Sequence, residues 1–162
     1  MGKSGKQVQL GGEKVFFGET AINLDAKGRL AVPMRYRDDL KKQCENRLVL
    51  TYSAFDSGVL WLYLEEEWQR VRDEIMDLPS LNPAHRALQR RLVGSATAVE
   101  PDGSGRILLP SSLRDFTGLE KRVVLLGMGS RFEIWNENTL NQKRVEENLE
   151  EQASEEMGRL VL

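Results

Sequence analysis

A nine-residue motif occurs twice in this chain, at residues 25–33 (DAKGRLAVP) and again at residues 102–110 (DGSGRILLP). The two copies lie 77 residues apart, and Arg37 recurs as Arg114 at the same offset. Two copies of one unit in a single polypeptide predict a pseudo-two-fold structure that presents the repeated motif twice. The duplication constrains the fold, because each element of one copy should have a counterpart in the other.

The offset between the two copies shortens further along the chain. Residues 62–64 match residues 134–136 at an offset of 72, so the first copy carries five extra residues. We place these extra residues in a loop near residues 52–58. The rest of each copy should have the same order of elements.

The pattern of apolar residues predicts that order. Thr20, Ile22 and Leu24 alternate with smaller or polar residues, which is typical of a half-buried strand. Each copy then runs strand, turn, strand, short helix and two further strands. The expected ranges are 34–44 for the helix, 48–52 and 59–64 for strands of the first copy, and 97–100, 106–109, 123–126 and 131–135 for strands of the second.

Helices are predicted outside this repeated unit. Helical periodicity begins at Glu65, and a second helix should follow, with Asn82 as N-cap, Pro83 at its first position and Gly94 after its end. A last helix is expected over residues 138–156. We therefore expect an α+β protein with a small β core and helices outside it.

Composition narrows the class of protein. At 162 residues with 40% hydrophobic content, the chain can bury one core or two small interlocked ones. No apolar run has the length of a membrane span, and the first twenty residues lack a secretory apolar stretch, so a cytoplasmic protein is expected. A single cysteine, Cys44, excludes an internal disulfide and a thiolate-rich zinc site, and we expect neither metal nor cofactor.

The charges are segregated along the chain. Residues 145–162 hold six glutamates and one arginine, so residues 1–144 carry 22 basic and 19 acidic side chains. A mildly cationic body with an acidic tail is compatible with phosphate binding on one face, although the formal net charge is −2. Residues 1–14 are rich in Gly, Lys and Gln, and are expected to be a flexible arm or a remnant of expression.

Each copy of the motif places an aspartate at a turn and an arginine four residues later. A positive φ accounts for Gly28 and Gly105, and an aspartate at such a turn can accept hydrogen bonds from nearby backbone amides. Arg29 and Arg106 have two interpretations, both open at this point. In the first, each arginine forms a salt bridge with its aspartate that stabilises the turn. In the second, the aspartate orients the guanidinium toward a phosphate or a guanine edge.

The two D-x-x-x-R turns run into R-[LI]-x-[VL]-P, and residues 16–18 (FFG) and 86–92 (RALQRRL) precede them. Together these motifs resemble the MraZ family of bacterial transcription regulators over nearly all of residues 15–145. The resemblance implies the AbrB-like swapped-hairpin fold, in which hairpins interlock into a β-barrel with flanking helices. Here the two halves of one chain would interlock. The expected segments are 15–94 for the first repeat with its helical connection, 95–145 for the second, and 146–162 for an acidic helical tail.

Members of that family assemble into rings and bind repeated sequences upstream of the division and cell-wall gene cluster. The resemblance therefore implies double-stranded DNA with direct repeats near a promoter as partner, further copies of this chain in a ring, and a nucleoid-associated location in the cytoplasm. It implies no membrane and no small-molecule substrate. Lys27 is replaced by Ser104 in the second turn, so the first turn is expected to contribute more. The expected DNA-binding residues are Asp25, Lys27, Arg29, Asp102 and Arg106.

Two rival functions are weighed against a DNA-binding regulator. An enzyme is disfavoured, because no nucleophile can be paired with the sole histidine, His85, and no metal-ligand cluster is present in the sequence. An antitoxin-like or adaptor protein on the same fold stays open: such proteins tend to need a disordered partner-binding tail, and the acidic, helix-patterned segment 145–162 does not decide whether one is present. We expect a regulator without enzymatic activity, and salt-dependent retention of DNA separates it from both rivals.

Overall fold

The strands and helices follow the repeat in the sequence. The computed structural model describes residues 15–162, and the predicted N-terminal arm over residues 1–14 lies outside this range. The first repeat forms β1 (Phe16–Asn23), β2 (Arg29–Ala31), α2 (Met34–Cys44), β3 (Leu48–Tyr52) and β4 (Val59–Leu64), followed by α3 (Glu65–Met76) and α4 (Pro83–Leu92). The second forms β5 (Thr97–Val99), β6 (Arg106–Leu108), α5 (Ser111–Thr117), β7 (Arg122–Gly129), β8 (Arg131–Asn136) and α6 (Glu137–Glu146), then α7 (Leu149–Gln152) and a 3₁₀ turn (Met157–Arg159).

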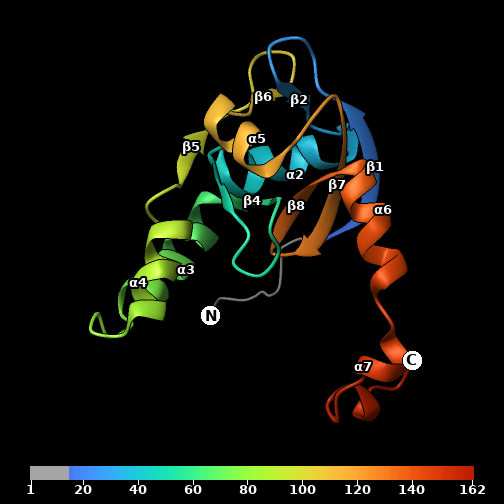
Figure 1. The fold of residues 1–162 in the computed structure, drawn as a ribbon. Coiled ribbons are helices and arrows are strands. Elements are labelled where there is room, and N and C mark those ends of the chain that lie inside the picture. Colours follow the sequence, from blue (N-terminus) through green and yellow to red (C-terminus); the bar gives the residue numbers. More distant parts are fainter. Residues whose placement is uncertain (1–14) are drawn as a thin grey trace, which may run out of the picture.

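Every strand of the first repeat pairs with a strand of the second. The antiparallel pairs are β1 with β7, β3 with β5, β4 with β8, and β2 with β6 (Figure 1). Six strands form one sheet in the order β1-β7-β8-β4-β3-β5, and β2 and β6 form a separate pair. The α+β class is confirmed. The closed barrel is not, because the sheet ends at β1 on one side and at β5 on the other.

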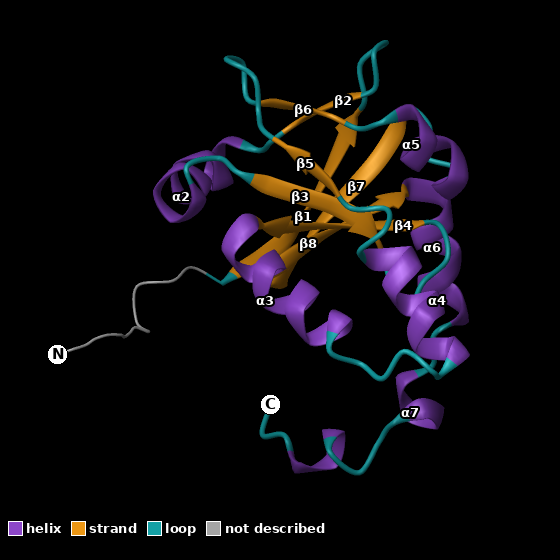
Figure 2. Ribbon diagram, turned by 90° about the vertical axis from the view of Figure 1, so that its left-hand side faces the viewer, coloured by secondary structure: helices purple, strands orange, loops and turns teal. Residues whose placement is uncertain are grey.

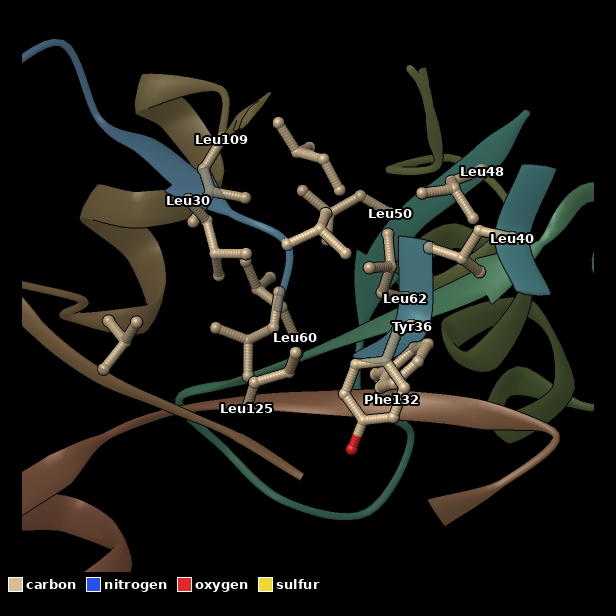
Figure 3. Close-up of a cluster of buried hydrophobic side chains, with 14 of the residues drawn as sticks. Leu30, Tyr36, Leu40, Leu48, Leu50, Leu60, Leu62, Leu109, Leu125 and Phe132 are labelled. Atoms are coloured by element: carbon tan, nitrogen blue, oxygen red, sulfur yellow. The ribbon is translucent and has the colours of Figure 1, made fainter. Parts of the chain in front are cut away.

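One face of the six-stranded sheet packs against α2, α5 and the β2–β6 pair. Leu60 and Leu62 of β4 point to this side, where they join Leu30 of β2 and Phe132 of β8 in a buried cluster (Figure 3). Tyr36 of α2 packs edge-on against Phe132, with ring centroids 5.0 Å apart. This core fixes the β2–β6 pair, and hence both turns, to the sheet.

The opposite face packs against α3, α4 and α6. Residues of β4 that alternate with those of the first face, Trp61 and Tyr63, point to this side and contact the second buried cluster. Trp61, Trp68 and Trp135 are all buried here, as expected for core residues. Glu133 of β8 has a buried carboxylate. It accepts hydrogen bonds from the indole N–H of Trp135 (2.9 Å) and of Trp61 (3.3 Å).

The loop and the helix starts agree with the sequence. Six residues join β3 to β4, whereas Ser130 alone joins β7 to β8, so the five extra residues lie where they were predicted. Asn82 caps α4 by accepting from the N–H of Ala84 at 2.8 Å.

Among residues 15–162, no helix combines the length and the apolar character that crossing a membrane requires.

The predicted extent of the last helix was wrong. α6 ends at Glu146 and the chain is extended at Glu147, after which Asn148 caps a new short helix by accepting from the N–H groups of Glu150 and Glu151. Glutamates at the end of a longer helix would face the negative end of its dipole. Only Leu140 of α6 is buried, so no packing opposes the break.

The duplication predicts equal stability losses in the β2–β6 pair. Leu30 and Ile107 lie opposite each other in the pair and are 0% and 1% exposed. Leu30→Ala and Ile107→Ala should each lower the free energy of unfolding by about 2–5 kcal/mol, because each leaves a cavity in the same cluster. Urea unfolding measures both losses. A large loss for one variant with none for the other would contradict equivalent packing of the two repeats.

Candidate nucleic-acid interface

Both motif turns lie at one end of the molecule, one at each end of the β2–β6 pair. Both project beyond the β2–β6 pair, and α3, α4 and the C-terminal segment lie at the opposite end (Figures 1 and 2). Backbone hydrogen bonds extend the pairing up to the turns, because Val32 N–H donates to Gly105 O (2.8 Å) and Leu109 N–H donates to Gly28 O (3.0 Å). Residues 77 positions apart in the sequence are thereby placed on one surface.

In the first turn, the carboxylate of Asp25 organises the backbone. Its Oδ1 accepts from the N–H groups of Lys27 (3.0 Å) and Arg29 (2.9 Å), and its Oδ2 accepts from Arg29 Nε (2.6 Å). Gly28 N–H donates to Asp25 O at 2.9 Å, and Gly28 has a φ of 81°, which a side chain disfavours. The aspartate thus shapes the turn and fixes one edge of the guanidinium.

The second turn repeats this arrangement. Asp102 Oδ1 accepts from the N–H groups of Ser104 and Arg106, both at 2.9 Å, and Oδ2 accepts from Arg106 Nε at 3.0 Å. Gly105 has a φ of 77° and donates to Asp102 O at 2.9 Å. The three residue types that both turns share, Asp, Gly and Arg, therefore form the same hydrogen bonds at the same spacing in both copies.

One ion pair crosses between the turns. Arg106 Nη1 lies 4.0 Å from Asp25 Oδ2, so this carboxylate has a guanidinium from each repeat beside it. The reciprocal pair of Arg29 with Asp102 is not among the ion pairs formed within residues 15–162. The two turns are thus equivalent in their hydrogen bonds and unlike in the charges around their carboxylates.

Neither arginine is enclosed by the protein. The side chains of Arg29 and Arg106 are 26% and 37% exposed. Each uses Nε on its own aspartate, and within residues 15–162 neither Nη1 nor Nη2 of Arg29 donates a hydrogen bond. A guanidinium held at Nε with open Nη donors can grip a phosphate or a base edge in two places.

The turns lower the pKa of their carboxyl groups. The backbone N–H of Arg29 is the largest cause of the lowered pKa of Asp25, and the Arg29 guanidinium and the Lys27 N–H add to it. The pKa of Asp102 is lowered in the same way, chiefly by the backbone N–H of Arg106. Hydrogen bonds to the charged form favour that form, so both carboxylates are ionised at neutral pH.

Sequence reasoning overlooked two arginines that contact the turns. Arg114 of α5 lies against Gly28 of the first turn, and Arg37 of α2 lies against Gly105 of the second. A Cβ on Gly105 would lie 2.6 Å from Arg37 Cζ, and one on Gly28 would overlap Arg114 in the same way. Positive φ is therefore only part of the reason for these glycines. The recurrence of Arg37 as Arg114 at the motif's own offset was the signal that could have revealed this role.

The charged groups of α4 lie away from the turns. Arg86 of α4 donates to the carbonyl of Ser80 at 2.6 Å, and α4 lies at the end opposite to the turns in both views (Figures 1 and 2). His85 Nδ1 lies 2.8 Å from Pro79 O. Within the described residues, no group of three or more His, Cys, Asp or Glu side chains is placed to hold a metal ion. The open Nη donors of the turns are suited to binding anions.

The lowered pKa values give a test of the turn geometry. The ionised carboxylates stabilise the turns at every pH above the ordinary aspartate range, and this stabilisation is lost only as the pH falls through the lowered values. Carboxyl ¹³C titration should place Asp25 and Asp102 below an aspartate in an unfolded peptide. Arg29→Met should remove part of the shift of Asp25 and leave the rest, since the backbone N–H groups at positions 27 and 29 persist; full restoration of the ordinary value would contradict the geometry.

Comparisons with known proteins agree with the duplicated architecture. A family model described as "MraZ protein, putative antitoxin-like" matches twice, at residues 15–91 and at residues 92–160. A protein of Stenotrophomonas maltophilia (strain R551-3) named "Transcriptional regulator MraZ" is 55% identical over 123 residues, which are 76% of this chain and 83% of that protein. A protein of the same name from Xylella fastidiosa (strain Temecula1) is 54% identical, over 76% of this chain and 83% of its own length. In Thioalkalivibrio sulfidiphilus (strain HL-EbGR7), the identity is 50% over 82% of this chain and 87% of the relative.

Two matches to one family model account for the two copies of the motif, and together they span almost the whole described chain. The similarity to the three relatives extends over most of both partners in each comparison. The chain therefore belongs to the MraZ family.

Proposed function

We propose that this protein is a sequence-specific DNA-binding transcriptional regulator of the division and cell-wall gene cluster, which binds repeated operator sequences. The shared name of the relatives supports a role in transcription regulation. The observation that carries the proposal is the pair of adjacent D-x-x-x-R turns, each with an ionised aspartate that holds a partly exposed guanidinium. Asp25, Lys27, Arg29, Asp102 and Arg106 form the DNA-binding surface, and the turns enter the major groove.

A ring of several subunits completes the proposed mechanism. One subunit presents two or three cations at its turns, which neutralise only a few phosphates and bind weakly at physiological salt. Several subunits on one particle raise the effective concentration, and avidity then exceeds one site's affinity by about a hundredfold or more. Head-to-tail contacts in a ring suit direct repeats in the DNA. Exposed apolar side chains such as Phe17, Phe55 and Phe116 offer surface for such contacts.

The exchange of strands between repeats supports the swapped-hairpin interpretation of the fold. We propose residues 15–94 and 95–145 as the two functional repeats, and residues 146–162 as an acidic tail. The β2–β6 pair combines one strand from each repeat, so both turns depend on both repeats.

A second candidate is an antitoxin-like or adaptor protein that binds other proteins. The C-terminal segment favours it, because Leu149, Leu160 and Val161 are exposed beyond the folded body. A protein-binding tail would act independently of the turns. Retention on DNA that falls steeply with salt supports the regulator, and no retention at low salt supports the second candidate.

Arg29→Ala should abolish retardation of an operator fragment in a gel, because it removes the open Nη donors of the first turn. A guanidinium on a guanine contributes about 1–3 kcal/mol per site, and a multivalent particle multiplies the loss. The mass of the oligomer should not change. Arg86→Ala, on the far helix α4, is the matched control and should bind like the parent protein; retained binding by Arg29→Ala would remove the turn from the mechanism.

The difference between the two turns provides a gain-of-function test. Ser104→Lys restores in the second turn the cation that Lys27 supplies in the first. Affinity should rise at low salt, and the slope of log K against log salt should steepen by about 0.9 for each phosphate gained per subunit. Fluorescence anisotropy over a salt series measures both. Ser104→Gln, of similar length and without charge, is the control, and an unchanged slope for the lysine variant would place this position away from the phosphates.

A further inference from the structure

Arg37 and Arg114 lie on the helices that follow the two motifs, and each contacts the turn of the other repeat. Arg114 belongs to α5 of the second repeat, yet its guanidinium lies against Gly28 in the first turn. Arg37 belongs to α2 of the first repeat and lies against Gly105 in the second turn. The proposed DNA-binding surface contains neither residue, and their crosswise placement calls for a separate explanation.

Around the first turn, Arg114 completes a short chain of hydrogen bonds. Arg114 Nε donates to Leu109 O at 2.9 Å, and Leu109 N–H donates in turn to Gly28 O at 3.0 Å. The guanidinium thus fixes the segment after β6, and that segment fixes the glycine between Asp25 and Arg29. The second repeat thus contacts the first turn at Gly28 in two ways. Leu109 donates to the carbonyl of Gly28, and the Arg114 guanidinium packs against its Cα.

The second turn has the same chain of contacts with the repeats exchanged. Arg37 Nε donates to Val32 O at 2.8 Å, and Val32 N–H donates to Gly105 O at 2.8 Å. Both arginines are half-buried. A planar guanidinium can donate through Nε and lie flat on a glycine at once, whereas a lysine ammonium on a flexible stem cannot do both.

We propose that Arg37 and Arg114 are positioning residues for DNA binding that act crosswise, with Arg114 setting the first turn and Arg37 the second. This inference rests on the proposed function, in which the turns bind DNA. Its distinctive consequence is that a change on the helix of one repeat damages the turn of the other. A direct contact of these arginines with phosphate is the competing explanation, and it predicts that charge alone suffices.

The first experiment needs no DNA. In protein labelled with [¹⁵N]glycine, with Gly28 and Gly105 assigned by sequential backbone connectivities, Arg114→Met should shift the Gly28 resonance strongly and the Gly105 resonance little. Arg37→Met should give the reverse. Lys42→Met is the control, because Lys42 lies on α2 with Arg37 and forms an exposed ion pair with Asp38. Larger shifts in the turn of the same repeat, or no shift in either turn, would overturn the inference.

The second experiment measures operator affinity. Arg114→Met should weaken binding about tenfold, within the range that couplings between contacting residues span. At low salt, where residual binding by Arg29→Ala can still be measured, the combination with Arg29→Ala should add little further loss, whereas the combination with Arg106→Ala should add its full effect. Arg37→Met should show the opposite pattern. Full additivity in both combinations would contradict positioning of a particular turn.

Arg114→Lys separates positioning from direct phosphate contact, and it serves as a second variant if the methionine variant fails to fold. Positioning predicts a loss close to that of Arg114→Met, with the Gly28 resonance shifted; near-parental affinity would overturn it. The two proposals can fail separately. If Arg29→Ala binds DNA normally, the proposed function fails while the glycine shifts still test the crosswise contacts. If Arg29→Ala loses binding and Arg114→Met changes neither glycine nor affinity, the inference alone fails.

Discussion

The pairing of every strand of one repeat with a strand of the other is the constraint on which the structure depends. β2 and β6 contribute three residues each and would be too short to persist alone, but each has its partner in the opposite half. Burial of Leu30 and Ile107 joins this short pair to the larger sheet. Each turn leads directly into β2 or β6. The exchange of strands therefore sets the distance between the turns and their relative orientation.

Much of the fold could be predicted because the duplicated sequence supplied each element with a second example. The strands 48–52 and 59–64 and the helix 34–44 match β3, β4 and α2, where alternation and apolar content were unambiguous. The partners of the strands could not be predicted in this way, since local pattern carries no information on register between distant segments. The end of α6 was missed because a single buried residue, Leu140, left the packing of residues 147–156 undetermined by periodicity.

At the candidate site, the sequence predicted the D-x-x-x-R spacing and the link between each aspartate and its arginine. Spacing of four residues suffices for that link, which is local. The contacts of Arg37 and Arg114 are not local, since they join a helix of one repeat to a glycine of the other. The positive φ of Gly28 and Gly105 could be expected from the sequence. The packing of a guanidinium from the other repeat against each glycine is seen only in the three-dimensional structure.

The inequality between the two turns has a consequence for how the protein could read DNA. A symmetric dimer presents two identical turns and cannot distinguish one direction along the double helix from the other. Here the first turn carries Lys27 where the second carries Ser104, and of the two aspartates only Asp25 has arginines from both repeats beside it within residues 15–162. Fusion of the copies in one chain lets the two turns diverge; under the proposed function, each subunit would then have a polarity along the DNA and would match a target without palindromic symmetry.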